Sequence, residues 1–171
     1  MKVLQDDLIG LGNLVGQAIN QAMDALKNRN LDASQRVVAG DDLIDQKRFE
    51  LEDQCIDLIG TQQPIAIDLR TLMAVLHISV ELERMGDYAE GISKISLLMG
   101  PNPPLKPLID IPTMSDRATL MLRNSIDALV SRDVIKANQV LLDDDEVDAL
   151  YDLVYRDLLV FMIEDPHTIE R

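Results

Sequence analysis

The stretch that decides the fold is Leu69 to Met99, LRTLMAVLHISVELERMGDYAEGISKISLLM. Apolar residues recur in it at alternating spacings of four and three, which predicts one long helix with a core-facing stripe. The expected stripe is Leu69, Met73, Leu76 and Val80. Continuing the spacing leads to Glu83 and Asp87, so two carboxylates occupy positions where leucines are expected. Because burying an unpaired carboxylate costs several kcal/mol, we expect these groups to be protonated, paired with a cation or bound to a metal.

The composition predicts an all-α protein. Of the 171 residues, 47% are hydrophobic and only 3% are aromatic, a balance that favours helices packed on helices. The formal net charge is −14, from 16 basic and 30 acidic side chains. This charge argues against nucleic acid as a partner and allows at most a peripheral contact with a membrane. Cations and basic protein surfaces are the better candidates.

The single cysteine, Cys55, excludes a disulfide framework and a thiolate metal site. No segment reaches the roughly 18 to 20 apolar residues of a membrane span, and residues 1–7 lack the layout of a signal peptide. These features predict a cytoplasmic protein in a reducing compartment.

Two further helices are expected before the deciding stretch. A narrow seam with the same four-three spacing predicts a first helix over residues 5–27; it consists of Leu4, Leu8, Leu11, Val15, Ala18, Ala22 and Ala25. Asp32 is the expected cap of the second helix. Its stripe is Val37, Asp41, Ile44, Arg48, Leu51, Cys55 and Leu58, so an acid again takes a core position. Asp45, one turn on, lies on the same side as Asp41.

The second and third helices are expected to form an antiparallel hairpin, because Pro64 ends the second helix. Folding the chain at residue 64 places residue n opposite roughly residue 128 − n. Asp45 then faces Glu83, and Asp41 faces Asp87. The sequence therefore predicts four carboxylates at one level of a helix–helix interface.

The chain contains an internal duplication. Residues 101–112 hold five of the seven prolines and predict an extended linker. After it, the apolar pattern of the first two helices returns at an offset of 103 residues, with a fourth helix expected over 113–131. Asp144 and Asp148 repeat Asp41 and Asp45. The expected organisation is a first three-helix repeat at 1–100, the linker at 101–112 and an incomplete second repeat at 113–171.

The second repeat is predicted to lack most of its last helix. Folding it at Pro166 would place the partners of Asp144 and Asp148 beyond Arg171. We therefore expect a C-terminally truncated second bundle whose apolar seam is exposed or covered by a partner.

Three interpretations of the four acids remain open. They can be a solvated acidic face, or they can pair with Arg48, Arg70 or Arg84. They can also bind metal, since oxygen ligands on facing helices suit iron, manganese, magnesium, calcium or zinc. No arrangement of Ser, Cys, His and acids supports nucleophilic catalysis, so we expect no enzyme.

Several spaced motifs resemble the PhoU family, accessory regulators of bacterial phosphate uptake. The third helix carries Asp68-Leu69-Arg70, then Glu83-Arg84-Met85-Gly86-Asp87, then Ile92-Ser93-Lys94, in the order of the family signature. The segments from Asp41 to Asp45 and from Asp144 to Asp148 are similar to its acidic motif. The resemblance spans essentially the whole chain. It implies tandem antiparallel three-helix bundles with the up-down topology of spectrin repeats.

The resemblance also implies a site and a function. A multinuclear metal cluster, of iron or zinc with manganese or magnesium as alternatives, is implied at Asp41, Asp45, Glu83, Asp87, Asp144 and Asp148. The family often has a glutamate in the first helix where this sequence has Gly16-Gln17. The implied function is negative regulation of phosphate uptake and of the phosphate-starvation response. The implied partners are a phosphate ABC transporter, a phosphate-sensing histidine kinase and a second copy of the chain in a dimer.

Two alternatives from other classes are a metal-storing or metal-dependent catalytic helical protein and a helical scaffold without metal.

Overall fold

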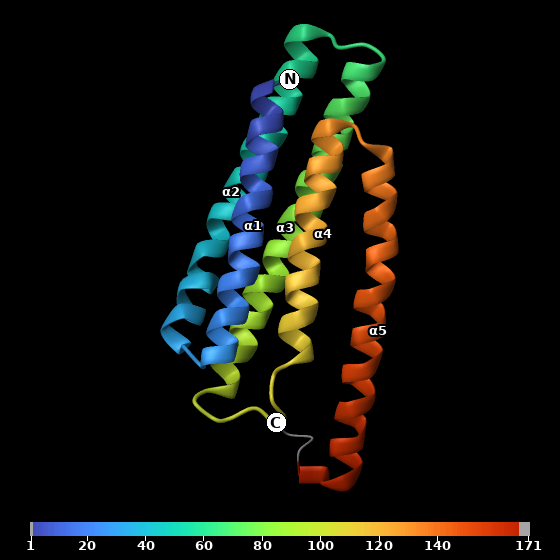
Figure 1. Ribbon diagram of the computed structural model, residues 1–171. Helices are drawn as coiled ribbons and strands as arrows, with labels where there is room; N and C mark the ends of the chain where they lie inside the picture. Colours follow the sequence, from blue (N-terminus) through green and yellow to red (C-terminus); the bar gives the residue numbers. More distant parts are fainter. Residues whose placement is uncertain (1, 168–171) are drawn as a thin grey trace.

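The computed structural model describes residues 2–167, which form five α-helices and no strand (Figure 1). The prediction of an all-α fold is confirmed. The helices are α1 (Lys2–Asn28), α2 (Leu31–Gln62), α3 (Ile67–Met99), α4 (Asp110–Ser131) and α5 (Val134–Glu164). The first three pack on one another in every pair, and α4 packs on α1 and α5. Within the described part of the chain, no helix carries an apolar stretch long enough to span a bilayer.

The core lies between α1, α2 and α3. The seam predicted for α1 is confirmed, since Leu4, Leu8, Leu11 and Val15 are all at most 1% exposed. Their partners on α2 include members of its predicted stripe. These buried members are Val37, Ile44, Leu51 and Cys55.

The prediction of which face of α3 is buried is wrong. Leu69, Met73 and Val80 are 39%, 44% and 42% exposed. The buried stripe is instead Leu72, Val75, Ser79, Leu82, Gly86, Ala89, Ser93 and Ser96. Small side chains let α3 approach its neighbours closely, and serine fits such an interface when its hydroxyl has a partner. The apolar pattern missed this face because serine and glycine do not count as apolar.

Two turns show that the internal repeat is also structural. Arg29 and Arg132, which are 103 residues apart, both adopt a left-handed conformation, with φ of 54° and 56°. The next residues, Asn30 and Asp133, cap α2 and α5 by accepting a backbone N–H bond from the third residue beyond, at 3.0 and 2.9 Å. The prediction that Asp32 caps α2 is therefore wrong, because Asn30 is the N-cap residue.

The α4–α5 hairpin docks through α4 against α1. Gly12 makes this approach possible, because a Cβ atom there would lie 2.0 Å from Cδ1 of Ile126. α4 begins at Asp110, three residues before the expected start, so the connection from α3 is shorter than the predicted linker. α5 has one buried residue, Val154, and many exposed apolar ones. The predicted missing helix concerns positions beyond Arg171 and stays a prediction.

Candidate metal-binding site on the α2–α3 hairpin

The hairpin of α2 and α3 brings the four predicted acids to one region. Gly86 sets the spacing of the two helices, since a Cβ atom there would lie 3.0 Å from Cδ1 of Ile44 and 3.4 Å from Oδ1 of Asp41. Further along, Ser34 Oγ donates a hydrogen bond to Ser96 Oγ over 3.0 Å. Both contacts agree with a chain folded close to residue 64.

The acids lie at the edge of the helix interface and not within the core. Asp41, Asp45 and Glu83 are half-buried, and Asp87 is exposed. The interpretation of Glu83 and Asp87 as replacements for core leucines is therefore wrong, because the neighbouring residues Leu82 and Gly86 form the buried face of α3 at this level. At this edge water still reaches the carboxylates, so a cation from solution has access to them.

The carboxylates act on one another electrostatically. The pKa of Asp41 is raised to about 6, first by burial and then by neighbouring negative charges. Those charges are, in decreasing order of effect, Glu90, Asp87, Asp45 and Glu83. The pKa of Glu83 is also raised, by burial first and then by Asp87 and Asp45. The pairs from the two helices therefore form one acidic unit, as the folding argument predicted.

Sequence reasoning missed Glu90, the neighbour with the largest charge effect on Asp41. Its position, three residues after Asp87 on the same helix, could have indicated it. Glu90 also pairs with Lys94, whose Nζ lies 2.6 Å from its Oε2.

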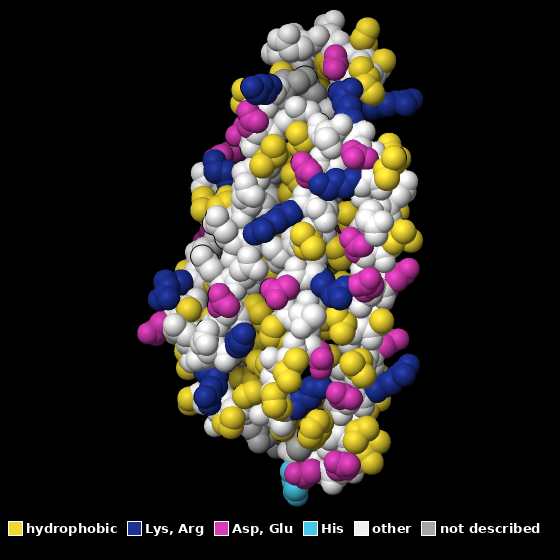
Figure 2. All heavy atoms as spheres, in the orientation of Figure 1, with side chains coloured by type: hydrophobic (Ala, Val, Ile, Leu, Met, Phe, Trp, Pro, Cys, Tyr) yellow, Lys and Arg dark blue, Asp and Glu magenta, His cyan; other side chains and the backbone are white. Residues whose placement is uncertain are grey.

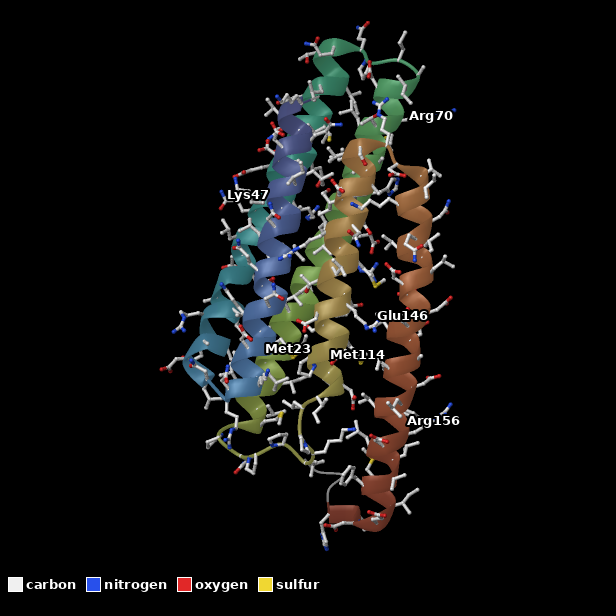
Figure 3. All side chains as sticks on the ribbon, in the orientation of Figure 1. Met23, Lys47, Arg70, Met114, Glu146 and Arg156 are labelled. Carbon is white, nitrogen blue, oxygen red and sulfur yellow. The ribbon has the colours of Figure 1, made fainter. Side chains whose placement is uncertain are left out.

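The arginines that could neutralise the acids pair elsewhere. Arg48 binds Glu52 and Arg84 binds Glu81, each over 2.9 Å. Arg70 lies near the α2–α3 connection, toward one end of the molecule (Figure 3). Arg48 and Arg84 offset part of the rise in the pKa of Glu83. In residues 2–167 no ion pair joins an arginine to Asp41, Asp45, Glu83 or Asp87. The interpretation that arginines neutralise these four acids therefore loses its support.

One oxygen of the acidic unit lacks a partner. Asp45 Oδ1 is buried without a hydrogen bond, as is the nearby Arg48 Nε. A buried carboxylate oxygen without a donor is costly, and a cation would relieve it. The donor set, all carboxylate oxygens, is the chemistry that hard cations prefer.

The oxygens are not gathered into a coordination shell. Across the described residues, no group of three or more His, Cys, Asp or Glu side chains is arranged to hold a metal ion. The residues thus fit a cation by their chemistry, and ligation would require the half-exposed side chains to rotate together. A hollow of about 150 Å³ lies beside Asp41, and Gln17 and Arg36 also line it.

The acids of the second repeat have no such neighbours. Asp144 and Asp148 are exposed on α5. α5 packs on α4 alone among the described helices, so no third helix supplies facing carboxylates there. The structure brings together Asp41, Asp45, Glu83 and Asp87, and it leaves Asp144 and Asp148 apart.

Fold and site define an all-helical protein of long antiparallel helices with an acidic patch on one hairpin. A model of the PhoU domain matches twice, at residues 8–96 and 111–170, and covers most of the chain. The first residues of the matches, 8 and 111, lie 103 apart, which is the offset of the sequence repeat. The chain therefore belongs to the PhoU domain family.

Individual relatives agree with this assignment. The phosphate-specific transport system accessory protein PhoU homolog of Aquifex aeolicus is 38% identical, over 98% of this chain and 76% of the relative. The PhoU accessory protein of Edwardsiella tarda is 30% identical, over 99% of this chain and 70% of the relative. The crystal structure of PhoU from Pseudomonas aeruginosa superposes with a TM-score of 0.93 at 26% identity, covering 99% of this chain and 82% of that one.

Proposed function

We propose that this chain is a negative regulator of phosphate uptake and of the phosphate-starvation response. It acts by contact with a phosphate ABC transporter and a phosphate-sensing histidine kinase. Relatives that align over nearly all of this chain are named accessory proteins of a phosphate-specific transport system, which supports this role. The structure suits a docking protein, because its long helices expose much charged and apolar surface.

The second part of the proposal is a metal site on the α2–α3 hairpin. Asp41, Asp45, Glu83 and Asp87 would hold iron or zinc, or else manganese or magnesium, in a multinuclear cluster. The observation that carries it is the buried, unpartnered Oδ1 of Asp45 within this group of acids, and the raised pKa of Asp41 agrees with it. A bound cation would cancel the repulsion among the acids and fix α2 against α3. Asp144 and Asp148 would take part only where a further helix supplies facing ligands.

The third part concerns assembly. We propose that α4 and α5 belong to a second unit that repeats α1–α3, because their turn and cap repeat those of α1 and α2. We also propose that the chain forms a dimer with a second copy of itself. Sedimentation velocity at several protein concentrations tests this pairing, and a monomer at all of them would contradict it.

A complementation experiment tests the regulatory role. The chromosomal gene is deleted in its own host, and the chain is returned from a plasmid. We expect the deletion to raise expression of a phosphate-starvation reporter in high phosphate and the wild-type chain to lower it again. Failure of the wild-type chain, at normal expression, would contradict the regulatory role.

The metal site is tested in the same strain. Asp41→Asn with Glu83→Gln removes two charges from the acidic unit, and we expect it to leave the reporter high. The matched control, Asp152→Asn with Glu164→Gln, removes two exposed charges from α5 and should behave as wild type. Full repression by the Asp41 and Glu83 variant would contradict a regulatory role for the metal site and leave the regulatory role of the chain intact.

A further inference from the structure

A leucine-rich stripe of α3 lies outside the helical core. Leu69, Met73 and Val80 are exposed, and Leu76 is half-buried beside them. Their spacing of four, three and four is that of a helix that packs along another helix. The bundle of α1, α2 and α3 does not use this stripe, because the small residues of α3 form its buried face. The spacing therefore indicates a helical partner outside the bundle.

α2 adds a second stripe next to the first. Starting at Asp45, which faces α3, spacings of four, three and four lead to Phe49, Glu52 and Ile56 on the same side of the helix. Arg48 lies among them, with its Cζ atom 3.9 Å from the ring centre of Phe49 and its Nη1 atom 2.9 Å from Oε2 of Glu52. Because α2 and α3 pack directly on each other, their exposed apolar residues form one surface, which we call the hairpin face. It consists of Phe49 and Ile56 of α2 and of Leu69, Met73 and Val80 of α3.

The hairpin face lies away from the second repeat. Two hollows of about 340 and 300 Å³ separate α3 from α4 and α5, and no residue of the hairpin face lines either of them. In Figure 1, α2 and α5 lie on opposite sides of the molecule. A third helix of the second repeat would pack on α4 and α5, as α3 packs on α1 and α2, and so would lie on the side of these hollows. The hairpin face would stay uncovered with such a helix in place.

Unpaired carboxylates continue the hairpin face at one end. The stripe of α3 runs on into Glu83 and Asp87, and the stripe of α2 begins at Asp45. None of the ion pairs formed by the described residues involves these three side chains or Asp41. Oδ1 of Asp45 is buried without a hydrogen-bond donor. A partner with lysine or arginine at this end would supply donors and positive charge, whereas an acidic partner would be repelled.

We propose that the hairpin face binds a helix of a partner protein that is apolar along one half and basic along the other. This deepens the proposed function and rests on it in assuming that the chain acts through protein contacts. The apolar half lies on the hairpin face, and the basic half lies among Asp41, Asp45, Glu83 and Asp87. From Leu69 to Asp87 the stripe rises about 27 Å at 1.5 Å per residue, which is the length of a helix of about 19 residues.

The partner helix and the proposed metal would use the same oxygens. A cation bound by the four carboxylates neutralises the charge that attracts the basic half of the helix. The two occupants therefore exclude each other, and metal binding releases the partner.

α5 carries another apolar surface, which provides the control. Figure 2 shows hydrophobic side chains exposed over α4 and α5 in this view, and Leu141 and Tyr155 of α5 are exposed. Among the described helices, α5 packs on α4 alone. Substitution of these two residues therefore leaves the hairpin face unchanged.

The probe is a fluorescein-labelled synthetic helix of about 19 residues, with leucine at four-three spacing along one half and arginine at the same spacing along the other. Two versions carry the halves in opposite order, because the helix can run along the hairpin face in either direction. Two acidic counterparts have glutamate in place of every arginine. In buffer with a chelator, we expect saturable binding of at least one basic version by fluorescence anisotropy and no binding of the acidic ones.

One pair of variants tests the apolar half of the contact. Met73→Lys with Val80→Lys should weaken binding at least about tenfold, because it places charge on the hairpin face. Leu141→Lys with Tyr155→Lys adds the same charge to α5 and should change binding less than about twofold. Circular dichroism must show both variants folded.

A second pair tests the basic half. Asp41→Asn with Glu83→Gln should weaken binding at least about tenfold, because it removes two of the unpaired charges. Asp152→Asn with Glu164→Gln removes two exposed charges from α5 and should change binding less than about twofold. Wild-type protein loaded with manganese, at a measured content of about one ion per chain, should bind at least about tenfold more weakly than protein in chelator.

Several results would overturn the proposal. Equal binding of the acidic versions, or unchanged binding to the Asp41 and Glu83 variant, would remove the charge argument. Equal weakening by the Leu141 and Tyr155 variant would place the contact elsewhere. A wild-type dimer that the Met73 and Val80 variant dissociates would assign the hairpin face to a second copy of the chain. Equal binding to the manganese-loaded protein would contradict the mutual exclusion. Binding in chelator requires no metal, so a protein that takes up no metal contradicts the metal site and leaves the contact intact.

Discussion

Replacing Asp41 by asparagine should make the metal-free protein more stable at neutral pH. Burial first, and then the neighbouring acids, raise the pKa of Asp41 from 3.8 to about 6, so the folded state holds this proton more tightly than the unfolded chain does. The stabilisation from protonation of Asp41 is fully present at pH values below its pKa in the unfolded chain, 3.8, and is lost as the pH rises through about 6. At pH 7.5 the wild-type protein therefore carries an unfavourable charge that asparagine lacks.

The size of the effect follows from the change in proton affinity. Each tenfold change in affinity corresponds to about 1.4 kcal/mol, and solvent around the half-buried carboxylate screens part of it. We expect Asp41→Asn to raise the free energy of unfolding by about 1 kcal/mol at pH 7.5. For a chain of this size this raises Tm by about 2 to 4 °C.

Urea unfolding with a chelator, followed by circular dichroism between about pH 3.5 and pH 8, measures this effect. Below the unfolded pKa the variant and the wild type should have equal stability, and the difference should appear between about pH 4 and pH 6.5. The exposed Asp152→Asn is the control and should show no such pH-dependent gain. A loss of stability at pH 7.5, or a difference that is the same at every pH, would refute the electrostatic reasoning.

Three further predictions concern packing, the thiol and metal linkage. Gly12→Ala should destabilise the fold by about 1 kcal/mol, because the new Cβ atom meets Cδ1 of Ile126. In a protein that already carries Ile126→Val, which lacks this Cδ1 atom, Gly12→Ala should be neutral or stabilising. An equal loss of stability in both backgrounds would contradict the close contact. Cys55 is buried and its pKa is raised by burial, so it should react with an aromatic disulfide reagent only after urea unfolding; rapid reaction of the native protein would contradict this burial. Added zinc or manganese should raise the Tm of the wild type and not that of Asp41→Asn with Glu83→Gln, and an equal rise in both would place the binding elsewhere.

The sequence predicted the elements best where apolar residues alone carry the pattern. The seam of α1 follows Leu4, Leu8, Leu11 and Val15, and all four are buried. On α3 the small residues decide the packing face, because they let the helices approach closely. Ser79 is 1% exposed, whereas Leu69, Met73 and Val80 of the expected stripe are about two-fifths exposed. A pattern of hydrophobicity alone is not sensitive to this choice.

The acidic unit was partly predictable for a geometric reason. The level at which two residues face each other in a hairpin depends mainly on where the chain turns, and Pro64 marks that point. Which cation neutralises the acids depends on side-chain positions, and Arg48 and Arg84 turn out to pair with Glu52 and Glu81. These local pairs, at spacings of four and three, compete with pairing across the hairpin.

The metal content of the purified protein tests the central claim most directly. The protein is purified without chelators, dialysed against iron, manganese or zinc, and analysed for metal per chain. We predict at least about one bound ion per chain in the wild type and none in Asp41→Asn with Glu83→Gln, because that variant replaces two of the four carboxylates by neutral amides, which attract a cation less strongly. A wild-type stoichiometry near zero that none of the three metals restores would contradict the metal site.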